Sequence, residues 1–396
     1  MPCSSRDTER QALNTAAEWA TIMSNAWILN LETMAVTRLS LLLSIWAAAG
    51  CSNKTTDDDG RDTGTDSCAE ASGCLFAEDL PFGLLSVQIP RDDDVWIVGS
   101  SPEPADGTGP AILHYDGADW DRIDTSAWAG TEIWWSWVTD EEAIFVGNEG
   151  LILEMSRSDG SLTRVDGPTS DITFFGVWGA STDDVWAVGM SDGGEGPRAL
   201  WRREGGTWSP WTDPALGEGD DNVSYFKVHG TRADDVWMVG TQGRTLRWDG
   251  SELREVPSDT DTPTATSLFL TIDADPAQPV VVGGTGNGLI LEYDGTAWRD
   301  RSPDFQPGFN GVCSGADQQW AVGQKGVRAR RTGDGVWTAD MDLGLGPLSY
   351  DDWHGCEVSP SGALWTVGGR IASRPLQSGI IGYQGPGSPT ALPTSW

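Results

Sequence analysis

One seven-residue pattern recurs through the chain and limits its possible folds more than any other feature. Near copies of DDVWxVG stand at 93–99, 183–189 and 234–240, and looser copies stand at 141–147, 279–283, 318–323 and 363–368. Val precedes the closing glycine in every copy, and these glycines are Gly99, Gly147, Gly189, Gly240, Gly283, Gly323 and Gly368. Successive glycines are roughly 40 to 50 residues apart, a period that indicates one supersecondary unit repeated along the chain rather than several unrelated domains.

Each repeat combines four short β-rich runs that are separated by turns containing Gly and Asp. An apolar stretch such as FFGVWG (174–179) precedes DVWxVG, a run such as LILEYDG (289–295) follows it, and a further Trp such as Trp298 comes next. Four runs of this kind form a four-stranded antiparallel blade. A helical solenoid would need a 3.6-residue periodicity, and stacked sandwiches would not repeat in one register. The sequence therefore predicts an all-β fold, a single seven-bladed β-propeller of four-stranded antiparallel blades.

An Asp pair precedes Val-Trp in the three near copies of the pattern. Asp side chains accept hydrogen bonds from backbone N–H groups two residues further on, so we expect turn formers between the first and second strands. These residues are Asp93, Asp94, Asp183, Asp184, Asp234 and Asp235. Catalytic carboxylates are the alternative, but pairs on three blades lie too far apart to meet at one substrate. We expect the Trp of each copy to pack between adjacent blades.

The repeats resemble those of bacterial lipoproteins with WD40/YVTN- or BNR-like β-propellers. The likeness covers residues 82 to 388 and resides in DDVWAVG, in the YDG string that follows and in the Trp after it. This resemblance implies the fold and leaves the function open, because propellers include enzymes, scaffolds and lectins. The stretch from Ser156 to Thr163 only approaches the Asp-box of the BNR group, so a sialidase-like activity is not implied.

An export signal begins at Met34. Arg38 supplies a positive charge, an apolar run extends from Leu39 to Ala49, and this run is too short to span a membrane. The segment Ala48–Cys51 resembles a bacterial lipobox, in which the Cys becomes the lipidated first residue of the mature protein. We therefore expect Cys51 to carry the lipid, for example palmitate; an ordinary secretory signal with an incidental Cys is the alternative.

These signals divide the chain into four parts. Residues 1–33 form an over-extended N-terminus or a long n-region, residues 34–50 the lipoprotein signal peptide, residues 51–74 an acidic flexible tether, and residues 75–396 the single propeller. The tether is polar and acidic, and it has too few apolar groups to offset the entropy of ordering. We expect an exported protein, lipid-anchored in the bacterial cell envelope at the outer membrane or the cell surface.

The net charge of −34 excludes some classes of partner. Nucleic acid requires clustered Lys and Arg, and anionic lipid also repels an acidic chain. The sequence contains no P-loop, HExxH or HxH string. Its three histidines, His114, His229 and His354, are distant in sequence, so we expect strand histidines with hydrogen-bond partners rather than a metal site. No cofactor and no metal is predicted.

One alignment points to a ligand surface. When the first strands are aligned on the Trp of the second strand, matching positions hold Gln88, Trp137, Trp178, His229, Ile272, Cys313 and Glu357. Trp134 and Trp135 lie close to one of them. Aromatic and polar side chains near a propeller axis suit stacking on a sugar or binding of a peptide. Packing between blades is the alternative interpretation of the same residues.

The function predicted from these features is a lipid-anchored binding or scaffold propeller without catalysis. Its ligand surface would comprise Trp134, Trp135, Trp137, Trp178, His229 and Glu357, and its partners would be the membrane, through the lipid, and an envelope protein or glycan. The alternative is a glycan-acting enzyme, a hydrolase or lyase, that uses the central funnel.

Four cysteines remain as disulfide candidates if Cys3 is removed and Cys51 is lipidated. Cys68 and Cys74 are close in sequence, which makes their pairing easy, and export to an oxidising compartment favours bridges. Cys313 and Cys356 align one position apart on neighbouring first strands, so their side chains can face one another between blades. Two unlinked buried thiols are the alternative for this second pair.

The outer strand of the last blade has no clear signal. Either residues 390–396 supply it, or residues 75–81 cross over and close the ring.

Overall fold

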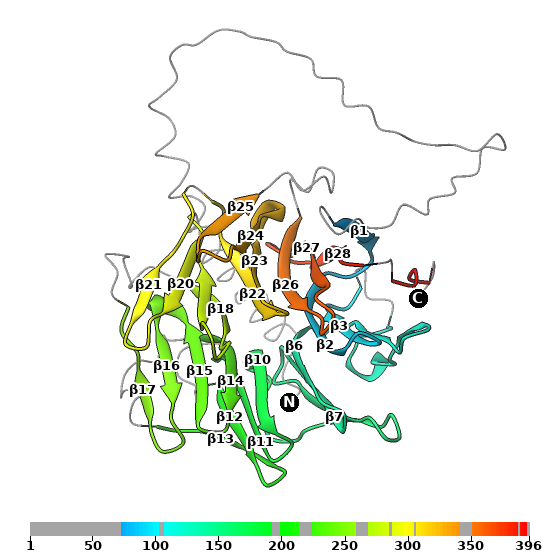
Figure 1. The fold of residues 1–396 in the computed structure, drawn as a ribbon. Coiled ribbons are helices and arrows are strands. Elements are labelled where there is room, and N and C mark those ends of the chain that lie inside the picture. Colours follow the sequence, from blue (N-terminus) through cyan, green and yellow to red (C-terminus); the bar gives the residue numbers. More distant parts are fainter. Residues whose placement is uncertain are drawn as a thin grey trace, which may run out of the picture.

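The computed structural model describes residues 73–102, 107–191, 199–213, 224–258, 268–284, 287–304, 306–340, 351–386 and 389–393. Within them the strands form seven four-stranded antiparallel sheets around a common centre (Figure 1). The predicted seven-bladed propeller is thus confirmed. The predicted signal peptide, most of the tether, Cys51 and Cys68 lie outside the described residues. No helix of the described residues is long and apolar enough to span a membrane.

The first four blades follow the chain in simple order. Blade 1 contains β2 (Leu84–Arg91), β3 (Asp94–Gly99), β4 (Ile112–Tyr115) and β5 (Trp120–Arg122). Blade 2 contains β6 (Ile133–Val138), β7 (Glu142–Gly147), β8 (Ile152–Ser156) and β9 (Leu162–Arg164). Blade 3 contains β10 (Ile172–Ser181), β11 (Asp184–Ser191), β12 (Leu200–Glu204) and β13 (Thr207–Pro210). Blade 4 contains β14 (Tyr225–Arg232), β15 (Asp235–Gly240), β16 (Thr245–Trp248) and β17 (Leu253–Glu255).

The last three blades complete the ring. Blade 5 contains β18 (Phe269–Asp273), β19 (Val280–Gly283), β20 (Leu289–Tyr293) and β21 (Trp298–Asp300). Blade 6 contains β22 (Phe309–Gly315), β23 (Gln318–Gly323), β24 (Arg328–Arg331) and β25 (Trp337–Asp340). Blade 7 contains β26 (Asp352–Val358), β27 (Leu364–Arg370), β28 (Gln377–Gln384) and β1 (Cys74–Leu80). Short 3-10 turns occupy Ser126–Trp128, Thr241–Gly243 and Gln324–Gly326.

Blade 7 takes its outer strand from the beginning of the described chain. β1 pairs with β28 and starts at Cys74, the last residue of the predicted tether. Of the two closures left open by the sequence, the crossing of residues 75–81 is therefore correct, and a strand from residues 390–396 is wrong. The tail instead lies against blade 1, where the Trp120 indole N–H donates to the Thr390 carbonyl at 2.9 Å and Leu392 packs on the core.

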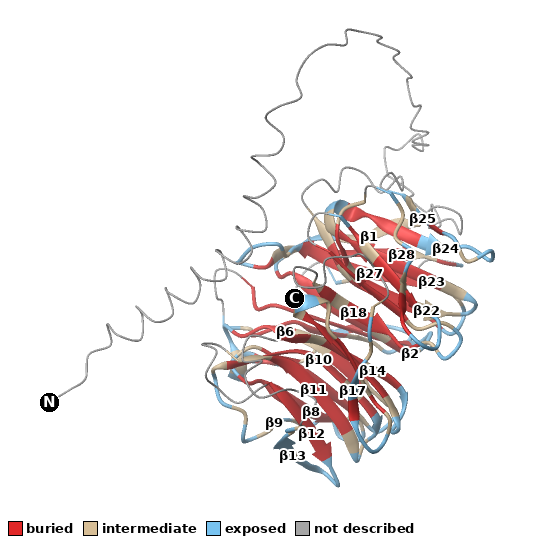
Figure 2. Cartoon of the chain, turned by 90° about the vertical axis from the view of Figure 1, so that its left-hand side faces the viewer, coloured by how far each residue is buried: buried red, intermediate tan, exposed pale blue. Residues whose placement is uncertain are grey.

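Seven apolar clusters fill the ring, one at each interface between adjacent blades (Figure 2). The Trp of the DVWxVG pattern lies in such a cluster in all five repeats that have one: Trp96, Trp186, Trp237, Trp320 and Trp365. The predicted packing of these residues between blades is confirmed. Because each cluster joins two blades, no blade buries its core alone.

The two Asp residues of each pair have different roles. Asp93, Asp183 and Asp234 lie in the turns, as predicted, but the second Asp of each pair begins the next strand. Asp94 accepts from the Trp96 indole at 2.8 Å, and Arg157 of the neighbouring blade reaches its other oxygen. The prediction of turn formers is therefore wrong for Asp94, Asp184 and Asp235, whose carboxylates bind indole N–H or Arg groups instead.

The closing glycine of the pattern is required by a close approach of two strands. A Cβ added to Gly240 would lie 1.9 Å from the carbonyl oxygen of Ser224, and the equivalent glycines of the other blades meet the same obstacle at 1.9 to 2.1 Å. The obstacle is backbone, which cannot rotate away. This contact explains why glycine occupies the position in every repeat.

Substitution of this glycine is expected to weaken the fold. Gly240→Ala forces β14 and β15 apart, and we expect the free energy of unfolding to fall by about 3 kcal/mol. Urea denaturation measures the change. Gly333→Ala is the matched control, because an added Cβ there meets no atom within 4 Å. Equal stabilities of the two variants would contradict this account of the repeat.

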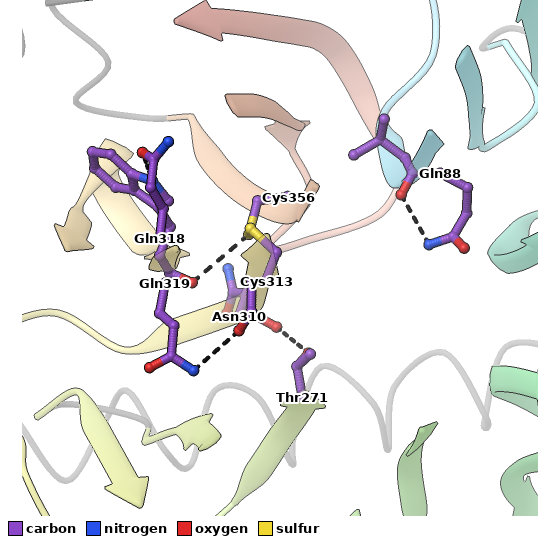
Figure 3. The surroundings of a disulfide bond; sticks show 10 residues. Gln88, Thr271, Asn310, Cys313, Gln318, Gln319 and Cys356 are labelled. Atoms are coloured by element: carbon purple, nitrogen blue, oxygen red, sulfur yellow. Dashed lines mark hydrogen bonds between the residues drawn. A yellow bond between two sulfur atoms is a disulfide. The ribbon is translucent and has the colours of Figure 1, made fainter. Parts of the chain in front are cut away.

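A disulfide joins the first strands of blades 6 and 7. Cys313 of β22 and Cys356 of β26 are bonded, with their Cα atoms 5.7 Å apart (Figure 3). The bridge predicted from their offset of one strand position is present. Cys74 is also disulfide-bonded, but its partner lies outside the described residues.

Candidate functional site

The first strands of the blades line the axis, since each of them contacts the first strand of the next blade around the whole ring. Every first strand has a β-bulge near its start that leaves one residue unpaired. We call these seven residues the collar: Leu85, Trp134, Phe175, Phe226, Leu270, Asn310 and His354. A bulge re-aims the side chain of the unpaired residue relative to the regular alternation of the strand.

A second set of residues lies three positions further along. These residues pair with the position three before the closing glycine, and we call them the mouth ring: Gln88, Trp137, Trp178, His229, Asp273, Cys313 and Glu357. The alignment from sequence found six of them and was wrong in blade 5. Ile272 pairs with Val281 and is buried between blades 4 and 5, so Asp273 is the true member.

Side chains from blades that are not neighbours meet at the level of the collar. The ring of Trp134 lies 5.7 Å from that of His354, and the Lys227 Nζ atom lies 3.1 Å from the centre of the Trp135 ring. Blades 2, 4 and 7 contribute these residues, so their contacts cross the axis. We call Trp134, Trp135, Phe175, Lys227 and His354 the plug, because they contact one another across the axis.

The plug contains two titratable groups whose pKa values are lowered by burial. Lys227 is only 3% exposed, and its ammonium donates to the Phe175 carbonyl at 3.0 Å. Burial lowers the pKa of Lys227 well below its usual value. Burial, together with the charge of Lys227, lowers the pKa of His354 to about 3, although the bond from its Nδ1 to the Leu85 carbonyl opposes this. His354 is therefore neutral.

An ion pair reinforces this end of the channel. Arg374, in the loop between β27 and β28, binds both oxygens of Glu132 at 2.7 and 2.8 Å. Glu132 directly precedes β6, so the pair connects blade 7 with blade 2 across the start of blade 1. Glu132 is 6% exposed, and a bidentate pair of this kind fixes the loop geometry.

The two tryptophans of the mouth ring pack on the next blade. Trp137 lies where a Cβ on Gly179 would meet its ring at 2.9 Å, and Trp178 lies where a Cβ on Gly230 would meet its ring at 2.7 Å. These contacts explain the glycines of the VWG and VHG strings. Trp137 is 8% exposed, so packing between blades describes this residue, and little of its ring is left for a ligand.

His229 and Asp273 form a polar contact in the mouth ring. The Ala274 N–H donates to Nδ1 of His229 at 2.8 Å, and the same nitrogen is 3.4 Å from an oxygen of Asp273. Nδ1 of His229 accepts this hydrogen bond with its lone pair and therefore carries no proton that it could donate to Asp273. Burial lowers the pKa of His229 and raises that of Asp273. The site is thus a neutral imidazole beside a carboxyl group whose pKa is raised by burial.

Glu357 lies in the same ring, two blades from Asp273. Burial and the charge of Asp273 raise the pKa of Glu357 to about 8. None of the hydrogen bonds or ion pairs found among the described residues involves its carboxyl group. At neutral pH Glu357 is therefore mainly a carboxylic acid, which can release its proton when a positive charge arrives.

The imidazole of His229 and the ammonium of Lys227 differ in access to solvent. The side chain of His229 keeps 38% of its surface exposed, whereas Lys227 of the plug keeps 3% for the whole residue. A ligand therefore reaches a polar side chain at the mouth ring, whereas the plug offers the half-buried rings of Trp134, Trp135 and His354. Within the described ranges, no group of three or more His, Cys, Asp or Glu residues is arranged to hold a metal ion.

The predicted ligand residues are thus distributed over both levels. Trp134 and Trp135 belong to the plug, while Trp178, His229 and Glu357 belong to the open mouth. Sequence reasoning missed Asp273, Lys227 and His354 as members of the site. A Lys inside the apolar string YFKVHG is the signal that points to Lys227.

Comparisons with known proteins identify the architecture and no family. No family model matches the sequence, and no curated protein is significantly similar to it. YCF48 from Cyanidioschyzon merolae has a TM-score of 0.58 at 14% identity, covering 79% of this chain and 99% of its own. A structure of YCF48 bound to D1 peptide gives 0.55 at 14%, with 78% and 95% covered. The RRP9 WD40 repeats give 0.57 at 10%, with 80% and 98% covered. At these identities the chain shares the propeller fold with all three.

Proposed function

We propose that this protein is a non-catalytic binding module of the cell envelope that holds a protein partner at the mouth ring. The observation that carries the proposal is the difference between the two levels of the channel. Aromatic rings and the buried Lys227 meet across the axis at one level, and the polar side chain of His229 stays accessible at the other. A polar channel mouth on a rigid ring suits insertion of a side chain from a partner. The similar fold of a propeller solved with a bound peptide supports this role.

Photo-crosslinking from single positions tests the proposal. A crosslinking amino acid replaces Asp183 or Asp317, which are exposed in turns beside the mouth, in the native host. Both positions are expected to capture the same envelope protein. The same amino acid at Asp166, exposed on the opposite face, is the matched control and is expected to capture none. Capture from Asp166 alone, or from neither turn, would refute binding at the mouth.

Lipid anchoring at Cys51 is the second part of the proposal, and it rests on the lipobox-like segment before this residue. Cys51→Ser is expected to abolish partition into the detergent phase. The variant protein is expected to be released or to remain unprocessed. Phase partition of the wild-type and variant chains measures this. Equal partition of the two proteins would remove the anchor from the proposal.

Hydrolysis of a glycan is a second candidate function, favoured by one observation. Glu357 is held as a neutral acid near a second carboxyl group, Asp273, which is the pairing that glycosidases use for proton donation. A panel of glycans incubated with the wild type and with Glu357→Gln tests this candidate. Turnover that disappears in the variant would support it, and no turnover by the wild type would exclude it.

A further inference from the structure

The blade topology brings most of the hairpin turns to one face. In an antiparallel four-stranded blade, the turn after the first strand and the turn after the third strand lie at the same end. Most of these turns contain acidic residues: Asp92, Asp93, Asp116, Asp119, Asp140, Glu141, Asp159, Asp183, Asp234, Asp249, Glu252, Asp275, Asp294, Asp317 and Asp334. Arg157 is the single basic residue in these turns, all of which the structure describes. We call this surface the turn face.

Part of this charge is paired locally. Arg232 binds Asp234, Arg254 binds Asp249, and Arg299 binds Asp294, all in exposed positions where such pairs contribute little. Asp183, Asp275 and Asp317 form no ion pair with any residue that the structure describes. The turn face therefore keeps a negative potential that attracts cations over its whole width.

The mouth ring lies in the centre of this face and holds a carboxyl group without a partner. Each mouth-ring residue is near the end of its first strand, next to the turn that follows. Glu357 is half-buried, and none of the hydrogen bonds or ion pairs of the described residues reaches it. Removing a carboxyl group from water without a partner is unfavourable. Asp273, 9% exposed, adds a second carboxyl group to the same recess.

The shape of the recess selects among possible cations. A divalent metal needs several converging ligands, and the described residues provide no group of three or more. A lysine or arginine side chain needs one or two carboxyl groups at its tip and an apolar surface along its stem. Trp178, half-buried beside His229 with ring centres 6.1 Å apart, offers that surface.

We infer that the mouth takes a lysine or arginine side chain from a basic segment of the partner, with its charge placed between Glu357 and Asp273. The inference rests on the proposed function and specifies the chemistry of the partner. The acidic turns around the mouth bind the remaining positive charges of the segment. Binding at neutral pH expels the proton that Glu357 carries.

Calorimetry with the full chain and a decalysine peptide tests this inference. At pH 7, titrations in buffers of different ionisation enthalpy are expected to show release of close to one proton per site. Glu357→Gln is expected to release none and to weaken binding about 10-fold, the equivalent of 1.4 kcal/mol. Glutamine has the shape of the neutral acid, so the fold is retained, and thermal unfolding verifies this. Asp166→Asn, on the opposite face, is expected to bind and release protons as the wild type does.

Several results would overturn the inference. Wild-type affinity and proton release in Glu357→Gln would show that the peptide binds only to diffuse charge on the turn face. No binding of decalysine, or displacement of it by millimolar calcium alone, would also refute it. These outcomes are distinct from failure of the proposed function. If a partner is crosslinked from Asp183 and Glu357→Gln does not change its capture, the proposed binding module stands. Only the inference that a basic side chain binds at Glu357 is then refuted.

Discussion

A chain that begins at Pro81 is expected to lose its cooperative unfolding transition, whereas a chain that begins at Gly73 is expected to keep it. The two differ by β1, the outer strand of blade 7, which pairs with β28. Phe76 of β1 packs on Trp120 of blade 1 and on Trp365 of blade 7, with ring centres 6.2 and 5.7 Å away. Loss of β1 therefore opens the seam between the first and last blades and exposes the edge of β28.

The expected loss is a large part of the total stability. Without β1, blade 7 has only three strands and the apolar cluster between blades 1 and 7 is uncovered. A loss of about 5 kcal/mol or more approaches the whole stability of an ordinary domain. Circular dichroism during thermal unfolding distinguishes the two truncated chains. Phe76→Ala in the longer chain is expected to cost about 2 to 3 kcal/mol without loss of cooperativity. A cooperative transition of wild-type midpoint in the chain from Pro81 would show that β1 is dispensable.

This closure illustrates what the sequence could and could not predict. The repeats are visible because seven copies of one packing solution must keep Val, Trp and Gly in register, and Gly240 shows why the glycine is fixed. β1 reads CLFAEDL and carries none of these signals. Its partner β28 lies at the other end of the chain, so only the geometry of a closed ring determines the pairing. A pairing between segments at opposite ends of the chain produces no regular sequence spacing from which it could be predicted.

The sequence predicts only part of the site, and the reason is related. In four blades the partner on the second strand stands eight positions after the mouth-ring residue, as Trp96 after Gln88. In blades 2, 5 and 6 it stands seven positions after, as Val280 after Asp273. Because side chains alternate along a strand, an error of one residue exchanges the channel residue for a core residue. That error replaced Asp273 by Ile272. The plug was missed because its contacts join blades 2, 4 and 7 across the axis, which no alignment of repeats displays.

The second large effect concerns pH. The stability of the wild type is expected to fall as the pH rises from about 4.5 to 8, and Glu357→Gln is expected to remove most of that fall. The folded pKa of Glu357 is raised to about 8 from an ordinary 4.5, so the folded chain binds more protons than the unfolded chain in this interval. Its free energy of unfolding therefore decreases with rising pH. Stability is fully present below the unfolded pKa and is lost as the pH passes the folded pKa.

The size of this effect follows from the shift and from the solvent in the mouth. Each unit of pKa corresponds to about 1.4 kcal/mol, and water that reaches the partly accessible side chain reduces the full value, so we expect about 3 kcal/mol. Urea denaturation at pH 5 and pH 9 measures it. At pH 5 the wild type and Glu357→Gln are expected to be equally stable, because the neutral acid and the amide are alike. At pH 9 the variant is expected to be the more stable by about 3 kcal/mol.

Asp273 contributes to the pH dependence of stability in the same direction, since burial raises its pKa too. A residual slope in Glu357→Gln that disappears with Asp273→Asn would therefore assign the remainder to that residue. Identical slopes in the wild type and Glu357→Gln would show that the pKa of Glu357 is not raised in the folded chain.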